Sequence, residues 1–216
     1  TDPAELPRHL RNLQREAAGN QGRAAIAGNF VNLLADKHFR LAATPYIAEG
    51  ITIGGDAIDE LRITGNRIED ANDGIRIAAS GRDDPNPPNW RDGRPPNRIA
   101  HAVISGNTVT LNPFSSATPA HGIILGHAER ATLGQNSVTM PDRLRVAPVA
   151  PHFGICQFGW RGPLLMISEN QVGGMENGIA VIPGLSDAQS GIWRLRDNAA
   201  QRTHRAYILA PCVVLA

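Results

Sequence analysis

Three titratable side chains occupy the same position in successive copies of a repeated segment. Glu49, Asp73 and His121 each precede a glycine that opens a short apolar run (Gly-Ile-Thr-Ile, Gly-Ile-Arg-Ile and Gly-Ile-Ile-Leu). If these runs stack as neighbouring strands, the three residues lie about 4.8 Å apart. Two carboxyl groups and an imidazole in one row could perform general acid–base chemistry. The alternative interpretation is structural, because turn residues of this kind often bond the local backbone.

A long polar segment contains the second group of candidate residues. Residues 80 to 98 read S-G-R-D-D-P-N-P-P-N-W-R-D-G-R-P-P-N-R. The prolines prevent a strand ladder, so we expect a surface loop with Asp83, Asp84, Trp90 and Arg91 as ligand-binding candidates. A tryptophan beside arginines suits stacking on a sugar ring or gripping a partner. Alternatively, the segment is a covering flap whose tryptophan packs on the body.

Two shorter insertions fall in consecutive repeats, at residues 111 to 121 and 140 to 152. Stacked, they would form a local wall, and His152 at the end of the second is a further ligand-binding candidate. The histidines lack zinc-binding spacing, and phosphate-binding glycine loops and nucleophile elbows are absent. We therefore predict no metal and no other cofactor.

The elements that position these residues come from a repeat built around asparagine. The copies read I-A-G-N-F-V, I-T-G-N-R-I, I-S-G-N-T-V, L-G-Q-N-S-V, I-S-E-N-Q-V and a degraded L-R-D-N-A-A. Their asparagines are Asn29, Asn66, Asn107, Asn136, Asn170 and Asn198, 28 to 41 residues apart. A pattern at such intervals indicates a solenoid. We expect each asparagine to adopt the left-handed conformation at a sharp turn, and the stacked amides to form a ladder.

The G-N-x-I and N-D-G-I-x-I phrases resemble those of the pectate-lyase-like superfamily, over roughly residues 24 to 209. The resemblance implies an all-β, right-handed parallel β-helix of about six rungs, where a rung is one full turn of the chain. The competing solenoid, the leucine-rich repeat, has shorter units of about 20 to 29 residues and an L-x-x-L-x-L phrase that this chain lacks. The superfamily includes lyases, hydrolases, epimerases, tail spikes, adhesins and structural modules. It implies an extracellular or surface-associated location but fixes no activity.

The resemblance adds one catalytic candidate and weakens another. Some pectate-lyase-like enzymes take their proton-abstracting base from an arginine, a role open to Arg76, which we expect to face outward. The pair Asp83-Asp84 is similar to the adjacent aspartates of polygalacturonase-like hydrolases, but it enters Pro-Asn-Pro-Pro instead of a strand. The Gly-His of that family is reversed at residues 121–122, and its Arg-x-Lys is absent. These departures count against a pectin hydrolase.

The chain divides into a cap segment at residues 1 to 23 and a β-helix domain at residues 24 to 216. Open solenoid ends need covers. Pro7 and the apolar stripe that follows it predict a short capping helix over residues 5 to 18.

Composition narrows the functional classes. The chain has 216 residues, 42% of them hydrophobic, which suits one domain with a continuous core. A net charge of +1 provides no strong field for nucleic acid, and no apolar run is long enough to insert in a membrane. The opening Thr-Asp-Pro resembles no secretory signal, so we expect a processed or excised chain. Cys156 and Cys212 are predicted to lie two rungs apart, too far for a disulfide, and therefore to be free thiols.

An apolar row is expected on the outside of the solenoid, two places after the repeat glycines. Its members are Ile124, Cys156, Ala180 and Ile208. An exposed apolar row marks an interface or a covered surface, so we predict either a homo-oligomer contact or a cover formed by the insertions. The sequence favours a non-catalytic β-helix module of a larger or oligomeric protein, holding a partner protein or a glycan. The alternative is a carbohydrate-active enzyme, a polysaccharide lyase or glycoside hydrolase, working on the face of rungs 2 to 4.

Overall fold

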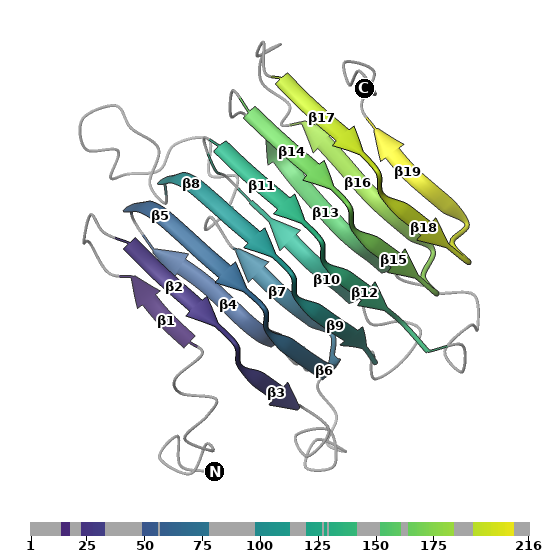
Figure 1. The fold of residues 1–216 in the computed structure, drawn as a ribbon, viewed down its shortest axis with the longest axis horizontal. Coiled ribbons are helices and arrows are strands. Elements are labelled where there is room, and N and C mark those ends of the chain that lie inside the picture. The colour runs from purple at the N-terminus through teal and green to yellow at the C-terminus, as the bar shows by residue number, and fades with distance from the viewer. Residues whose placement is uncertain are drawn as a thin grey trace, which may run out of the picture.

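The computed structural model is an all-β solenoid in the part of the chain that it describes (Figure 1). The described residues are 14–17, 23–32, 49–55, 57–77, 98–112, 120–126, 128, 130–141, 152–160, 164–183 and 192–209. They form 19 strands and no helix. No helix of membrane-spanning length and apolarity therefore occurs within these ranges.

The strands form three parallel sheets. Sheet A consists of β1 (Gln14–Ala17), β4 (Glu49–Gly55), β7 (Asp73–Ile77), β10 (Ala120–Leu125), β13 (His152–Trp160), β16 (Asn177–Pro183) and β19 (Arg205–Leu209). Sheet B consists of β2 (Arg23–Ala27), β5 (Ala57–Thr64), β8 (Arg98–Ser105), β11 (Arg130–Gly134), β14 (Leu164–Ser168) and β17 (Ile192–Arg196). Sheet C consists of β3 (Phe30–Asn32), β6 (Arg67–Ala71), β9 (Thr108–Leu111), β12 (Ser137–Thr139), β15 (Gln171–Gly173) and β18 (Ala199–Gln201).

The chain visits sheets B, C and A in turn, so six rungs run from β2 to β19. In Figure 1 the front strands run down to the right, the rear strands return, and the chain advances from the lower left to the upper right. This is the right-handed sense, the one favoured for connections between parallel strands. The predicted parallel β-helix of about six rungs is confirmed.

The predicted capping helix is not seen. Gln14–Ala17 form β1, which pairs in parallel with β4 and places Gln14 opposite Thr52. A strand forms here because the outer edge of β4 offers unpaired backbone groups, and pairing with them outweighs the local helical pattern. The rest of the proposed helix, before residue 14, lies outside the described residues.

The asparagine ladder runs along the corner between sheets B and C. The backbone N–H and the Nδ2 of Asn107 donate to Asn136 Oδ1 at 3.0 and 2.9 Å. The Nδ2 of Asn107 also donates to the carbonyl oxygen of Ile63 at 2.9 Å. The same pair of donors links every neighbouring asparagine from Asn29 to Asn198. Bonds to both neighbouring rungs satisfy amides that the four inner rungs bury almost completely.

The left-handed residue at this corner precedes the asparagine, which corrects the prediction. Positive φ values between 54° and 65° occur at Gly28, Gly65, Gly106, Gln135, Glu169 and Asp197. With the sharp turn one residue earlier, each asparagine directs both its backbone N–H and its side chain along the stack. The asparagine is therefore selected for its hydrogen bonds, and the preceding position is the one where glycine is favoured.

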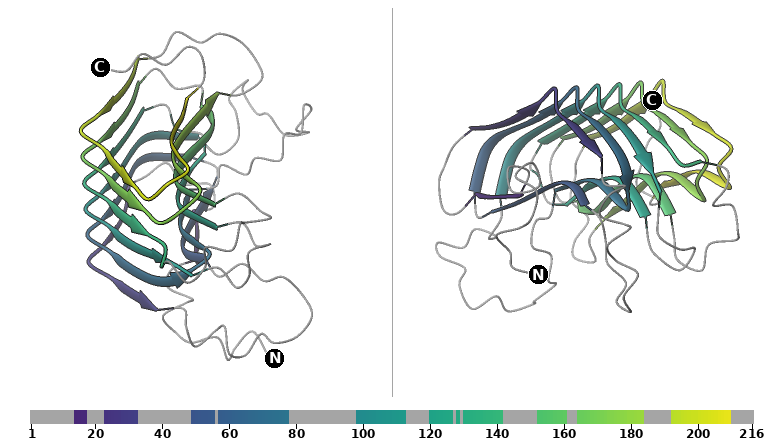
Figure 2. Two further views of the ribbon diagram at one scale, coloured as in Figure 1. Left: turned by 90° about the vertical axis from the view of Figure 1, so that its right-hand side faces the viewer. Right: turned by 90° about the horizontal axis from the view of Figure 1, so that it is seen from below.

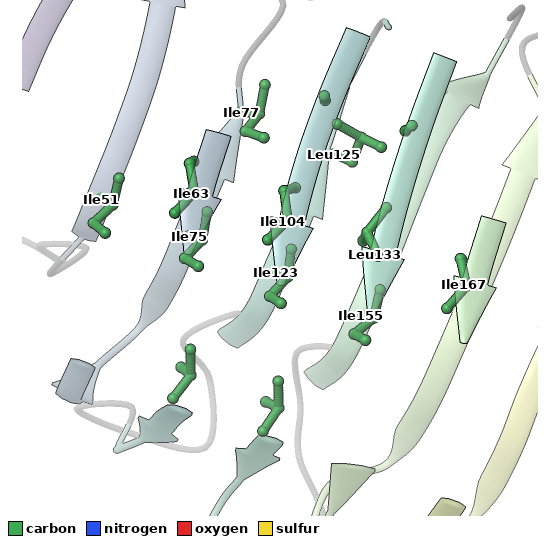
Figure 3. Close-up of a cluster of buried hydrophobic side chains, with 14 of the residues drawn as sticks. Ile51, Ile63, Ile75, Ile77, Ile104, Ile123, Leu125, Leu133, Ile155 and Ile167 are labelled. Carbon is green, nitrogen blue, oxygen red and sulfur yellow. The ribbon is translucent and has the colours of Figure 1, made fainter. Parts of the chain in front are cut away.

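The interior consists of stacked rows of branched apolar side chains (Figure 3). One row joins Ile51, Ile75, Ile123 and Ile155 of sheet A, and another joins Ile63, Ile104, Leu133 and Ile167 of sheet B, all of them fully buried. The repeat glycines of sheet A lie where sheet C approaches most closely. A Cβ atom on Gly122 would lie 2.2 Å from Val138 Cγ1 and 2.4 Å from the oxygen of Gly154. Glycine is required there for space.

Candidate functional site

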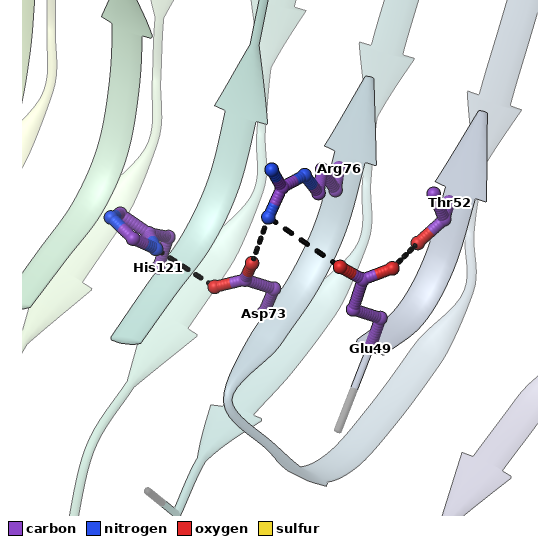
Figure 4. Close-up of polar contacts among 5 residues, drawn as sticks. All are labelled: Glu49, Thr52, Asp73, Arg76 and His121. Atoms are coloured by element: carbon purple, nitrogen blue, oxygen red, sulfur yellow. Dashed lines mark hydrogen bonds and ion pairs between the residues drawn. The ribbon is translucent and has the colours of Figure 1, made fainter. Parts of the chain in front are cut away.

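Sheet A places the predicted titratable residues on neighbouring strands. Glu49 on β4 lies opposite Asp73 on β7, which lies opposite His121 on β10. The same row continues through Phe153, Asn177 and Arg205. The register predicted from the repeat is therefore confirmed. Together with Thr52 and Arg76 on the same face, Glu49, Asp73 and His121 make up what we term the sheet A polar cluster (Figure 4).

Asp73 is the centre of this cluster. Its side chain is only 2% exposed. Its Oδ1 lies 2.8 Å from His121 Nδ1, and its Oδ2 accepts a hydrogen bond from Arg76 Nη1 at 3.0 Å (Figure 4). A carboxylate this deeply buried needs such partners, because an unpaired buried charge is strongly unfavourable. Asp73 therefore holds both neighbours in fixed positions.

Arg76 joins the two carboxylates. Its Nη1 also lies 3.4 Å from Glu49 Oε1, and Thr52 Oγ1 donates to Glu49 Oε2 at 2.6 Å. The Arg76 and Glu49 side chains are 38% and 29% exposed, so this edge of the cluster faces solvent. Two carboxylates and one guanidinium leave a formal charge of −1 if His121 is neutral and zero if it is protonated.

His121 lies at the opposite edge of the cluster. Its ring stacks on Phe153 with a centroid separation of 5.8 Å and an interplanar angle of 4°. The side chain is 16% exposed. Because Asp73 engages Nδ1, the remaining ring nitrogen is Nε2, whose direction is set by the carboxylate and the aromatic face together. An imidazole held in this way has the geometry of an oriented general base.

The other predicted ligand-binding residues are not brought to this cluster by the described structure. His152 begins β13, opposite Ala120, and is 1% exposed. Its backbone oxygen accepts a hydrogen bond from Asn177 Nδ2 at 3.2 Å. The burial of His152 separates its side chain from a surface ligand. Asp83, Asp84, Trp90, Arg91 and most of the two insertions lie outside the described residues.

The outer apolar row is covered at its centre. Ile124, Cys156, Ala180 and Ile208 lie in register, as predicted. Cys156 and Ala180 are completely buried and form, with Phe153, a small hydrophobic cluster separate from the interior core. Ile124 and Ile208 are half-buried against it. A single chain therefore covers part of the row, and the surface left for a partner is smaller than the sequence suggested.

Cys156 is a free thiol, as predicted, whereas Cys212 lies outside the described residues. Burial raises the pKa of the Cys156 thiol well above its ordinary value. The negative charge of Asp73 raises this pKa further, and Arg76 lowers it. The thiol therefore stays protonated and is a poor nucleophile, because only the thiolate reacts readily.

Two members of the site escaped the sequence analysis as functional candidates. Thr52 bonds Glu49, and Phe153 stacks on His121. The repeat did contain the signal for both. Thr52 occupies the outward position that Arg76 takes on the next rung, and Phe153 occupies the position before the repeat glycine. What the repeat could not show was which side chains along each row would touch.

Comparisons with protein-family models, curated proteins and solved structures found no match. Within the described ranges, no group of three or more His, Cys, Asp or Glu side chains is placed to hold a metal ion. The fold defines the chain as a parallel β-helix protein.

Proposed function

We propose that the protein is a non-catalytic parallel β-helix module of a larger or oligomeric protein, and that it binds a glycan across the sheet A polar cluster. The observation that supports this most is the pairing of all four carboxylate oxygens. Those of Asp73 are engaged by His121 and Arg76, and those of Glu49 by Arg76 and Thr52. The cluster therefore presents a fixed polar surface, with no unpaired acid poised to donate or take a proton.

The exposed groups suit sugar hydroxyls. A hydroxyl both donates and accepts, so it is best held where donors and acceptors lie side by side. Arg76 offers guanidinium donors and Glu49 a carboxylate edge 3.4 Å away, and both are partly exposed. The near balance of charge favours a neutral ligand over a strongly acidic one. The resemblance to the pectate-lyase-like superfamily, which includes many carbohydrate-active proteins, points in the same direction.

The test is a glycan array followed by titration of the best ligand, with mass spectrometry of the recovered glycan. Arg76→Gln should weaken binding at least about tenfold, because a charged hydrogen bond is lost. Arg194→Gln provides the matched control, since Arg194 is exposed on sheet B. Glu49→Gln keeps the shape of the side chain and its contact with Thr52. It therefore serves as a second binding variant if Arg76→Gln fails to fold. Absence of binding to any glycan, or equal loss in the control, would reject the proposal and leave a protein partner as the alternative.

One observation favours a second function, that of a carbohydrate-active enzyme. The Asp73–His121 contact orients the imidazole, so that Nε2 would take a proton from a sugar carbon while Arg76 stabilises the developing negative charge. The C–O bond on the neighbouring carbon would then break, and its leaving oxygen would take the proton back from the imidazolium. This enzyme would shorten the bound glycan, and His121→Gln would reduce cleavage about 10²- to 10⁴-fold with binding retained. Recovery of the glycan with unchanged mass excludes it.

A further inference from the structure

The last rung of the solenoid carries a local excess of positive charge. Residues 192–209 contain one acidic residue, Asp197, and four arginines: Arg194, Arg196, Arg202 and Arg205. Their formal charge of +3 exceeds the +1 of the whole chain. Residues 164–183, on rung 5, contain two glutamates and no lysine or arginine, a formal charge of −2. The positive charge is therefore concentrated at the C-terminal end of the coil.

β17 presents two of these arginines on the outer face of sheet B. The register places Arg194 opposite Met166 and Arg196 opposite Ser168. Side chains two residues apart on a strand point to the same side, with their Cα atoms about 6.6 Å apart. Both arginines are exposed, and neither forms an ion pair with any described residue. Asp197, the neighbouring acid, lies at the asparagine corner, where a φ of 54° turns the chain into sheet C. The two guanidinium groups are thus available to carboxylates of a ligand.

The same strand is an open edge of the core. β17 ends the strand order of sheet B, with β14 on one side and no described strand on the other. Seen from the C-terminal end, β17, β18 and β19 form the end of the coil nearest the viewer (Figure 2, left). Trp193 and Leu195 point inward, opposite Leu165 and Ile167. Leu165, covered by rung 6, is fully buried, whereas Trp193 is only partly buried. One more strand would complete the burial of Trp193.

We propose that the outer edge of β17 binds an extended segment of a partner protein, in which acidic and apolar residues alternate, as a seventh strand of sheet B. Two acidic side chains would lie beside Arg194 and Arg196, at the strand spacing of about 4.8 Å. Opposite charges on neighbouring strands stabilise a sheet, and backbone hydrogen bonds hold peptides at exposed sheet edges. The intervening apolar side chains would cover Trp193 and Leu195.

Charge on an edge strand commonly keeps other strands away. On β17 the charge has one sign and lies on the outer face alone, whereas the inner face is apolar. The edge therefore repels basic strands and admits acidic ones. β18, the edge strand of sheet C, carries Ala199 and Gln201 on its outer face and has no comparable selectivity.

A second copy of this chain does not fit the edge. The two arginines require two acidic residues separated by one residue, and the sequence of 216 residues contains no two acidic residues with that separation. Nucleic acid would match the charge but would not supply the inward apolar side chains. We therefore assign the edge to a different protein chain. The sheet A polar cluster lies on another sheet, so this assignment does not depend on glycan binding.

The experiment titrates the wild-type protein with synthetic peptides and follows its backbone amides by NMR, which measures weak binding and locates it. The acidic peptide is Val-Leu-Glu-Val-Glu-Val with blocked ends, and a matched peptide has lysine in place of both glutamates. The acidic peptide should bind at least about tenfold more tightly, because it forms two attractive cross-strand pairs where the lysine peptide forms two repulsive ones. Its largest shifts should fall on the amides of β17. Proline in place of the valine between the glutamates should prevent binding, because proline cannot pair as an inner part of a strand.

A charge reversal tests the role of the two arginines. Arg194→Glu combined with Arg196→Glu should reverse the preference, so that the lysine peptide binds at least about tenfold more tightly than the acidic one. Misfolding cannot produce this gain of binding. Arg130→Glu is the matched control, because Arg130 is an exposed residue on the outer face of β11, an inner strand of sheet B. This variant should keep the wild-type preference.

Failure of the acidic peptide to bind, or equal binding of the acidic and lysine peptides to the wild type, overturns the inference. So do largest shifts outside β17, undiminished binding of the proline peptide, or a reversal by Arg130→Glu as complete as that of the double variant. Displacement of the acidic peptide by polyglutamate at equal charge concentration would show attraction to any anion and would also overturn it. If the double variant fails to fold, the wild-type titrations alone decide.

Discussion

Asp73 and His121 are 48 residues apart in the chain, yet Asp73 Oδ1 and His121 Nδ1 lie 2.8 Å apart. The solenoid makes them neighbours, and Arg76 completes the pairing of the carboxylate. We predict that Asp73→Asn lowers the free energy of unfolding by about 1–3 kcal/mol, because one ionic partner is lost while Arg76 can still be hydrated. Urea unfolding followed by circular dichroism measures this. The matched change Asp59→Asn, at an exposed position on β5, should cost less than about 0.5 kcal/mol, and equal losses would contradict the prediction.

The ladder should be far more sensitive in its middle than at its end. Asn136 accepts two hydrogen bonds from Asn107 and donates to Asn170 and to the Ile104 oxygen. Asn136→Ala should therefore cost about 3–5 kcal/mol, since each bond contributes about 1 kcal/mol and buried donors are left unpaired. Asn29→Ala, on the exposed first rung, should cost about 1 kcal/mol. Urea titration of both variants gives the comparison, and a cost at Asn29 as large as that at Asn136 would falsify the ladder account.

The repeat glycines should resist even the smallest side chain. Gly122→Ala forces a Cβ atom to 2.2 Å from Val138 Cγ1 and 2.4 Å from the Gly154 oxygen. The backbone contact cannot be relieved by a rotamer change, so we expect a loss of about 2–3 kcal/mol. Gly134→Ala is the control, because its Cβ atom would meet nothing closer than 3.7 Å. Thermal unfolding should separate the two proteins clearly, and a Gly122→Ala protein as stable as Gly134→Ala would contradict the prediction.

The asparagine and glycine repeat predicted the rows of sheet A, because parallel pairing copies one register from rung to rung. It thereby predicted that Glu49, Asp73 and His121 lie side by side. The prediction that the asparagine itself is left-handed was wrong. Both the asparagine and the residue before it are compatible with a turn, and only the direction of the amide hydrogen bonds distinguishes them. Gln135, Glu169 and Asp197 carry no glycine signal, although their φ values are positive.

The repeat could not predict contacts that depend on other parts of the chain. The strand at Gln14–Ala17 depends on the edge of β4, which a local helical pattern does not reveal. The burial of Cys156 and Ala180 depends on what covers an outward face, and alternation alone predicts only the face. The stacking of His121 on Phe153 depends on side-chain rotamers, which the register does not fix. Each of these features arises from tertiary structure acting on a correctly predicted scaffold.

The corner before each asparagine offers a test of backbone strain with little change in packing. Gly65 has a φ of 64°, and a Cβ atom there would meet nothing within 4 Å. Gly65→Ala should therefore cost about 1–2 kcal/mol through the left-handed conformation alone. Gln135→Gly, at a φ of 57°, should change stability in the opposite direction by about 0.5 kcal/mol, because relief of strain exceeds the entropic cost of glycine. If the urea midpoints of both variants move in the same direction, this assignment is contradicted.

Cys156 provides a prediction about pH. Burial raises the pKa of its thiol in the folded protein, whereas the unfolded chain ionises near the ordinary value of about 8.5. The stabilisation from the neutral thiol is therefore complete below that pH. It falls as the pH rises toward the folded-state pKa, by up to about 1.4 kcal/mol per pH unit. In a Cys212→Ser background, iodoacetamide at pH 9 should modify Cys156 only as fast as the protein unfolds. Cys156→Ala should remove this part of the pH dependence of the free energy of unfolding. Rapid alkylation of the folded protein would show that the thiol is accessible and ionised.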